Sequence, residues 1–192
     1  MDEQYTIGGN LRERRRSKYA VVTFLPRALS DVVAPLRERF DPAYNLVAPH
    51  ITLVFPFDTV RPLDELAGLI KSETENEKSI QVQLESIGDF YPKSPVIFWS
   101  VRKNQQLTEL YFRLHVRLNI PIPYKNFVPH VTVASEISHH RLIIVKEQIA
   151  SYLAREKFHT ESIDLITPLV SGKWVSVRTF PLKGYSDKPS AS

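Results

Sequence analysis

Hydrophobic residues follow two different periodicities along the chain, and together they predict an α+β fold. In Ile80-Gln81-Val82-Gln83-Leu84 every second residue is apolar, the pattern of a half-buried β-strand. Runs rich in β-branched and aromatic residues predict further strands at 18–25, 50–55, 96–101, 158–167 and 173–182. Elsewhere apolar residues recur at helical spacing, which predicts amphipathic helices at about 31–40, 63–70, 107–118 and 142–156.

The order strand, helix, strand, helix, strand occurs in each half of the chain. This repetition predicts a bilobal duplication with pseudo-twofold symmetry, in which two antiparallel sheets are flanked by helices and enclose a central cleft. No long linker separates the halves, so we expect a single domain over 17–183. Its lobes fall at about 17–90 and 91–183, and strands can exchange between them. We expect 1–16 to form a flexible basic arm and 184–192 a flexible tail.

One short pattern also occurs twice, as Pro49-His50-Ile51-Thr52-Leu53 and as Pro129-His130-Val131-Thr132-Val133. Each copy reads as a strand in which the histidine and threonine face one side and the apolar residues face the other. Proline restricts the residue before it to extended backbone, and its own ring favours entry into a strand, so each histidine is expected at the strand's first residue. The duplication therefore predicts two histidines and two threonines facing each other across the cleft.

Two histidines are suited to acid–base chemistry on a phosphate. Their unperturbed pKa lies near neutrality, so one imidazole can accept a proton from water while the other donates a proton to a departing oxygen. The hydroxyls of Thr52 and Thr132 lie on the same face and can bind non-bridging phosphate oxygens. A lone histidine on a strand is more often structural, and it is the second copy in a matching context that favours catalysis.

Other chemistries find less support in the sequence. Zinc requires three or four nitrogen, sulfur or carboxylate ligands, and no third histidine or carboxylate accompanies the two motifs. The chain has no cysteine, no Gly-x-Ser-x-Gly elbow and six glycines in all, too few for an obvious Gly-rich phosphate loop. We therefore expect catalysis without a metal or other cofactor.

Composition adds little about partners. No apolar run approaches the length of a membrane span, and the polar N-terminus lacks a secretory signal, so a cytoplasmic location is expected. The net charge is +4, and much of the excess lies in Arg12, Arg14, Arg15, Arg16 and Lys18. This run is either an arm that contacts nucleic-acid phosphates or a solvated tail, and both readings stay open.

The two motifs resemble the paired His-x-Thr signatures of the 2H phosphoesterase superfamily, and within it the bacterial and archaeal 2′-5′ RNA ligase, or RNA cyclic phosphodiesterase, group. The resemblance extends over roughly 18–183 and includes Gly88-Asp89-Phe90, Trp99 and the closing Phe180-Pro181-Leu182. It implies a bilobal α+β fold and metal-free hydrolysis of 2′,3′-cyclic phosphates or 2′-5′ linkages. Some members also catalyse the reverse ligation of RNA ends.

Carried over by position, the resemblance makes His50 and His130 the acid–base pair and Thr52 and Thr132 the phosphate ligands. We assign water activation to His130 and protonation of the leaving oxygen to His50, although the sequence is symmetric on this point. Tyr124 and Phe127 are candidates to stack on a base, with ordinary loop packing as the alternative. Lys125 and Arg178 are candidate phosphate contacts.

The expected partners are RNA ends or small cyclic or 2′-5′ nucleotides, with no membrane and no protein partner, and the chain is expected to act as a monomer. The alternative function is an RNA-binding or RNA end-joining protein with little or no hydrolytic turnover.

Overall fold

The computed structural model describes residues 16–123 and 126–183, and its elements confirm the α+β class. The described part contains four helices, α1 (Arg27–Phe40), α2 (Leu63–Thr74), α3 (Gln105–Leu118) and α4 (His139–Tyr152). It also contains eight strands, β1 (Ser17–Phe24), β2 (His50–Thr59), β3 (Ile80–Asp89), β4 (Ile97–Val101), β5 (His130–Ala134), β6 (Glu156–Thr160), β7 (Ser162–Pro168) and β8 (Trp174–Pro181). The expected flexible arm, apart from Arg16, and the expected tail lie outside the described residues.

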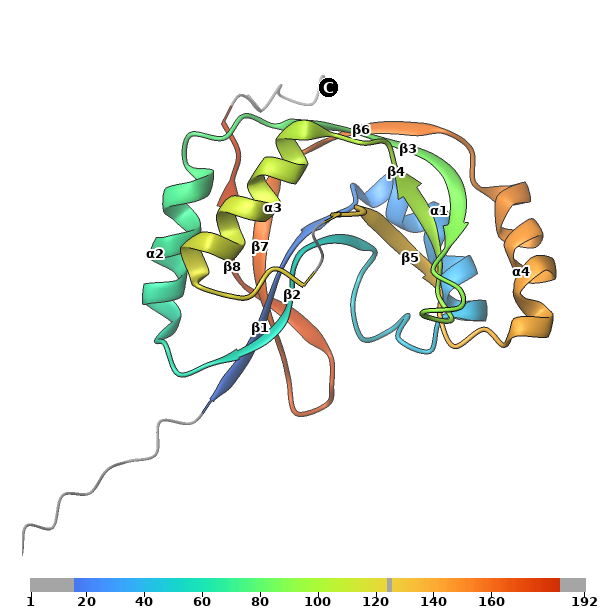
Figure 1. Cartoon of the computed structure of the whole chain (residues 1–192), viewed down its shortest axis with the longest axis horizontal. Coiled ribbons are helices and arrows are strands. Elements are labelled where there is room, and N and C mark those ends of the chain that lie inside the picture. The colour runs from blue at the N-terminus through green and yellow to red at the C-terminus, as the bar shows by residue number, and fades with distance from the viewer. Residues whose placement is uncertain (1–15, 124–125, 184–192) are drawn as a thin grey trace, which may run out of the picture.

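All eight strands belong to one curved antiparallel sheet in the order β6-β3-β4-β5-β2-β1-β7-β8 (Figure 1). The prediction of two sheets is therefore wrong. The two halves of this single sheet meet where β2 pairs with β5, and the one residue pair in this contact is Ile51 with Val131. This contact is short, but it is enough to join two groups of four strands into a continuous sheet.

Strands cross between the two halves of the chain. β3 lies beside β4 and β6, whereas β7 and β8 extend the sheet beyond β1. The segment predicted as one strand at 158–167 is two, because the chain leaves β6 at Thr160 and enters β7 at Ser162. Those two strands occupy the first and seventh places of the sheet, so the sheet must curl strongly to bring them together. A bridge between Lys78 and Lys183 links the β3 and β8 ends in the same region.

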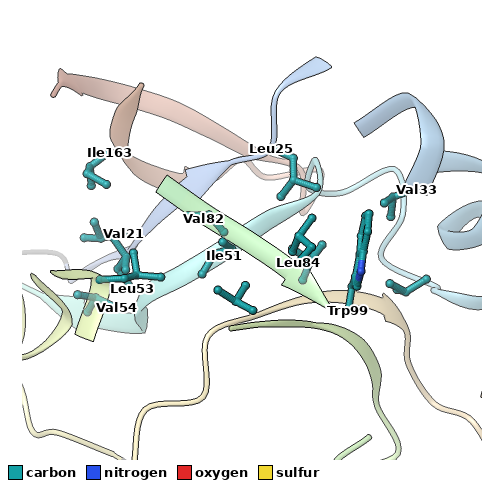
Figure 2. Close-up of a cluster of buried hydrophobic side chains, with 14 of the residues drawn as sticks. Val21, Leu25, Val33, Ile51, Leu53, Val54, Val82, Leu84, Trp99 and Ile163 are labelled. Carbon is teal, nitrogen blue, oxygen red and sulfur yellow. The ribbon is translucent and has the colours of Figure 1, made fainter. Parts of the chain in front are cut away.

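The helices cover one face of the sheet, here called the core face and defined by Ile51, Trp99 and Val131. α1 packs on β5, α3 on β2, α2 on β8 and α4 on β3. Figure 2 shows part of this core, with Val21, Leu53 and Val82 gathered close to Ile51, and Trp99 near Val33. One large apolar cluster thus includes residues from both halves of the chain.

Two prolines lie inside regular elements: Pro56 in a strand that was expected to end before it, and Pro35 in a helix that was expected to begin only at about residue 31. β2 continues through Pro56 because the strand bulges there: Phe55 and Pro56 stand opposite the single residue Ala20, so a missing N–H disturbs no regular pair. α1 begins at Arg27, and Pro35 lies well inside it. The carbonyl of Asp31, which loses its helical partner at Pro35, belongs to an exposed residue and can be hydrated.

Candidate active site

The register of the sheet brings the two His-x-Thr motifs together. Because Ile51 pairs with Val131 and the strands are antiparallel, His50 lies opposite Thr132 on the neighbouring strand, and Thr52 lies opposite His130. These four side chains share the face opposite the helices, here called the motif face. Diagonal neighbours in a regular antiparallel ladder lie about 7–8 Å apart, which leaves room for one phosphate between the two imidazoles.

Each imidazole is held by the same local hydrogen bond. Nδ1 of His50 lies 2.8 Å from the carbonyl oxygen of Ala48, and Nδ1 of His130 lies 2.8 Å from that of Val128. A carbonyl oxygen only accepts, so Nδ1 carries the proton in both rings and donates it. Nε2 is therefore the atom that takes up or releases a proton in each histidine. Both β2 and β5 thus carry a histidine whose Nε2 is available on the motif face of the sheet.

The residues before the histidines fix where both strands begin. The carbonyl of Pro49 accepts from the backbone N–H of Leu25 at 3.1 Å, and the carbonyl of Pro129 accepts from that of Val101 at 3.2 Å. Both bonds join the motif to the neighbouring strand at the equivalent place. The predicted position of each histidine, at the first residue of its strand, is confirmed.

The surroundings of the two rings differ. His130 lies edge-on to Phe90 at 4.8 Å between ring centroids and tilted against Phe98 at 5.1 Å. His50 has Phe24 as its aromatic neighbour, 6.2 Å away. Among the described residues, the hydroxyls of Thr52 and Thr132 form no hydrogen bond with the protein, so both can donate to a ligand.

Burial lowers the pKa of both histidines. The pKa of His50 falls from 6.5 to about 4, mainly through loss of hydration, and positive charge on Arg37 and His130 lowers it further, against opposing effects of the Ala48 carbonyl and Asp41. The pKa of His130 also lies below its ordinary value because of burial, although the Val128 carbonyl opposes this. Positive charge on His130 therefore disfavours protonation of His50.

A buried ion pair anchors the loop that leads to His50. Arg37, near the end of α1, contacts Asp41 through Nε at 3.0 Å and Nη2 at 2.9 Å, and both side chains are almost fully buried. Arg37 also donates to the carbonyl of Val47 at 2.7 Å. Asp41 in turn accepts from the hydroxyl of Ser135 at 2.8 Å, just beyond β5. One ion pair thereby ties the approach to the first motif to the exit from the second.

Gly88 is needed for the position of Phe98 beside His130. A Cβ at this residue would lie 2.7 Å from two ring carbons of Phe98, which is closer than atoms in contact can approach. Phe98 itself packs on Phe90 with 4.3 Å between ring centroids. The glycine of the Gly88-Asp89-Phe90 segment thus leaves room for the Phe98 ring against its cross-strand partner.

We expect Gly88→Ala to destabilise the protein by about 1–3 kcal/mol, the usual effect of overpacking, and to lower activity by displacing Phe98 from His130. Urea denaturation measures the first effect. Gly68→Ala in α2 is the matched control, because a Cβ there meets no atom within 4 Å and alanine favours helix. Equal stability changes in the two variants would contradict the role given to Gly88.

Of the remaining predicted site residues, the structure describes Phe127 and Arg178, and both make their contacts elsewhere. Phe127 stacks on Tyr111 of α3, with 4.1 Å between ring centroids, and packs against the core. Arg178 lies on β8 opposite Leu165, a core-face residue, and donates to Asp64 of α2 at 2.8 Å. It therefore lies on the opposite face of the sheet from the motifs. Tyr124 and Lys125 lie outside the described residues.

Several residues near the site carried no recognisable signal in the sequence. Phe90, Phe98 and Arg37 are the clearest cases, and Trp174 of β8 belongs with them because it lines a pocket beside His50. Of these, Phe90 was part of a segment that supported the resemblance, but nothing linked it to His130.

Within 16–123 and 126–183, no three His, Cys, Asp or Glu side chains gather in a group that could hold a metal ion. In the same ranges no helix has the length and apolar character to cross a membrane.

Comparison with known proteins identifies the family of the chain. The model of the 2′-5′ RNA ligase superfamily matches residues 25–170. A protein of Halalkalibacterium halodurans, provisionally named a phosphoesterase, is 31% identical over 175 residues, covering 85% of this chain and 96% of its own length. A Bacillus pumilus protein with the same provisional name is 31% identical over 169 residues, covering 86% and 97%.

Solved structures show the same fold. LigT of E. coli in complex with 3′-AMP has a TM-score of 0.64 at 14% identity and covers 88% of this chain and 99% of LigT. TT0787 of Thermus thermophilus has a TM-score of 0.61 at 18% identity and covers 88% and 100%. The chain therefore belongs to the 2′-5′ RNA ligase superfamily of 2H phosphoesterases, as its paired motifs implied.

Proposed function

We propose that this protein is a metal-independent phosphodiesterase that hydrolyses 2′,3′-cyclic phosphate ends of RNA, or related cyclic or 2′-5′ nucleotides, by two-histidine acid–base catalysis. The observation that carries the proposal is the matched pair of Nδ1 hydrogen bonds. They leave Nε2 of His50 and His130 as proton-exchanging atoms on one face of adjoining strands. The bond alone is not distinctive, since Nδ1 of the buried His115 in α3 also lies 2.8 Å from a carbonyl oxygen. What distinguishes His50 and His130 is that the same bond occurs at equivalent positions of two paired strands.

The chemistry follows from an in-line displacement at phosphorus. Nε2 of one histidine removes a proton from water as its oxygen attacks, and Nε2–H of the other donates a proton to the ribose oxygen as its bond to phosphorus breaks. The hydroxyls of Thr52 and Thr132 donate to the non-bridging oxygens, where charge shifts during the reaction. We retain His130 as the base and His50 as the acid, which requires the single proton of the pair to lie on His50 in the reactive form although burial lowers the pKa of His50 to about 4.

Nucleotides as the substrate class are supported by the fold neighbours. Crystals of E. coli LigT contain 3′-AMP in one case and phosphate in another. The likeness to LigT is one of fold, so the argument for this chain rests on its own residues and on the family. A cyclic phosphate presents one phosphorus, two non-bridging oxygens and one leaving ribose oxygen, which match two hydroxyl donors and one acid.

The direct test offers three substrates to the full chain in excess EDTA: an RNA oligomer ending in a 2′,3′-cyclic phosphate, a 2′-5′ dinucleotide and a 3′-5′ dinucleotide. We expect hydrolysis of the cyclic end, with a single monophosphate isomer as product because only one ribose oxygen can lie next to the acid. Inertness toward both the cyclic end and the 2′-5′ linkage would overturn the proposal. Measured RNA affinity without turnover would instead favour a binding protein.

The pKa directions give an expected pH profile for kcat/KM, which reports the free enzyme. Activity needs one protonated and one neutral imidazole, and both pKa values lie below 6.5, with that of His50 at about 4. Above the higher pKa the pair loses its remaining proton and has no acid. We therefore expect kcat/KM to peak on the acidic side of 6.5 and to fall about tenfold per pH unit beyond it, about 100-fold between pH 6.5 and 8.5.

Initial rates at low substrate concentration, in buffers of constant ionic strength, measure this profile. A value of kcat/KM that stays level or rises between pH 6.5 and 8.5 would show that the two histidines do not act as the proton-exchanging pair.

A further inference from the structure

The two halves of the site are not equivalent, because a pocket of about 180 Å³ opens beside His50 and Thr52. Its apolar wall includes Val22, Val47, Ile166 and Trp174. Trp174 is half-buried, and its backbone N–H donates to the carbonyl of Leu46 at 2.7 Å, which fixes the start of β8 against the loop before His50.

The register of the sheet explains why the pocket exists on one side. Thr52 pairs with Val22 on β1, and Thr132 pairs with Phe98 on β4. Phe98 and Phe90 occupy the space next to His130 with two packed rings. The smaller Val22, with Ala20 nearby, leaves the corresponding space beside His50 open.

The pocket has the size and chemistry of a site for one ring system. It is smaller than the roughly 300–1,000 Å³ of pockets that enclose drug-sized ligands. An apolar cavity of about 150 Å³ already holds benzene. The polar side chains of the lining are His50 and Thr52, and both are assigned to the phosphate, so no further side chain of the lining is left to read the polar edge of a base. An indole, by contrast, offers a face on which any base can stack.

We propose that this pocket binds the nucleobase of the substrate, stacked with Trp174. The inference rests on the proposed function and gives the substrate an orientation. The base lies beside His50, so the ribose attached to it lies between the pocket and the phosphate, with its leaving oxygen next to His50 and the attacking water next to His130. Because stacking dominates, the enzyme accepts all four bases, with purines bound more tightly than pyrimidines.

Tryptophan fluorescence tests this binding without relying on turnover. The chain has two tryptophans, and Trp99 is fully buried in the core, so a stacked base is expected to quench only Trp174. Adenosine 2′-monophosphate should quench the wild type, and inorganic phosphate should not. Trp174→Ala should weaken Kd for the nucleotide by about 10- to 100-fold, the size of one base–aromatic stack. Trp174→Phe should keep the affinity within about threefold and lose the quenching.

Two further variants guard against a folding artefact. Val22→Phe copies the packing beside His130 and should fill the pocket, thereby weakening nucleotide binding without removing Trp174. Leu169→Ala, in the exposed turn of the same β7–β8 hairpin, is the matched control and should bind like the wild type. Thermal unfolding of each variant confirms that it is folded.

Kinetics with a base-free substrate separates this inference from the proposed function. For adenosine 2′,3′-cyclic phosphate, Trp174→Ala should raise KM by about 10- to 100-fold, whereas for the 2,3-cyclic phosphate of methyl riboside KM should not change. Nucleotide quenching without hydrolysis of either substrate would support the pocket and overturn the proposed function. Hydrolysis of both, with no quenching and equal KM in wild type and Trp174→Ala, would overturn the pocket alone.

Discussion

Replacing either His50 or His130 by alanine is expected to lower kcat for a 2′,3′-cyclic phosphate by about 10²- to 10⁴-fold, the usual contribution of a positioned general acid or base. The reason is geometric, since Nδ1 of each ring is held by a backbone carbonyl and Nε2 is the atom left to exchange a proton. Product affinity should change little, because the threonine hydroxyls and the pocket remain. Initial rates in EDTA with purified variants measure the effect.

His139→Ala is the matched control for these variants. His139 is exposed at the start of α4 and stacks on Tyr91, 4.6 Å away between ring centroids, so its loss should leave kcat unchanged. A similar loss of activity in all three variants would show that the assay reports damage to the fold and not proton transfer.

The two histidines should also respond differently to the leaving group. A nitrophenyl phosphodiester expels its phenolate without needing a proton, so the acid becomes dispensable and the base does not. We expect His50→Ala to recover most of its lost rate on this substrate, while His130→Ala stays impaired. The opposite pattern would exchange the two roles and place the ribose beside His130.

The second large effect concerns stability. Arg37→Ala is expected to destabilise the protein by about 3–5 kcal/mol, because it leaves the carboxylate of Asp41 buried without its cation. The side chains of this pair are 4% and 2% exposed. The loop before His50 also loses its bond to the Val47 carbonyl, so activity should fall at temperatures where the variant is still folded.

The same helix supplies a matched control. Arg27 and Asp31 form a second Arg–Asp pair at the same spacing, but their side chains are 96% and 71% exposed. Arg27→Ala should change the free energy of unfolding by less than about 1 kcal/mol. Urea denaturation of both variants measures the contrast. A difference of less than about 1 kcal/mol between them would contradict the anchoring role of Arg37.

Much of the fold could be predicted because its signals are local. Alternation at 80–84 and the helical stripe at Leu107, Leu110 and Leu114 each belong to one element, and both elements are found where expected. The motif pair was also visible in the sequence, because Pro-His-x-Thr constrains backbone direction and side-chain face at once. His50 and His130 accordingly begin β2 and β5.

What the sequence did not reveal depends on which strands become neighbours. The pairing of Thr132 with Phe98, or of Val22 with Thr52, is set by contacts between distant segments. The turn at Glu161 was not predicted either, because the segment 158–167 contains no glycine or proline that would mark a break between two strands. Arg178 is the converse case: its charge suggested a phosphate contact, but the β8 register turns it toward Asp64.

The most direct test of the central claim is the rate of hydrolysis of an RNA 2′,3′-cyclic end in EDTA by the double variant His50→Ala/His130→Ala, compared with each single variant. If the histidines act as one acid–base pair on one phosphate, the double variant should be slower than either single variant by less than about tenfold. Losses that multiply, or activity that requires an added divalent metal, would show that the two residues do not act as the metal-free catalytic pair proposed here.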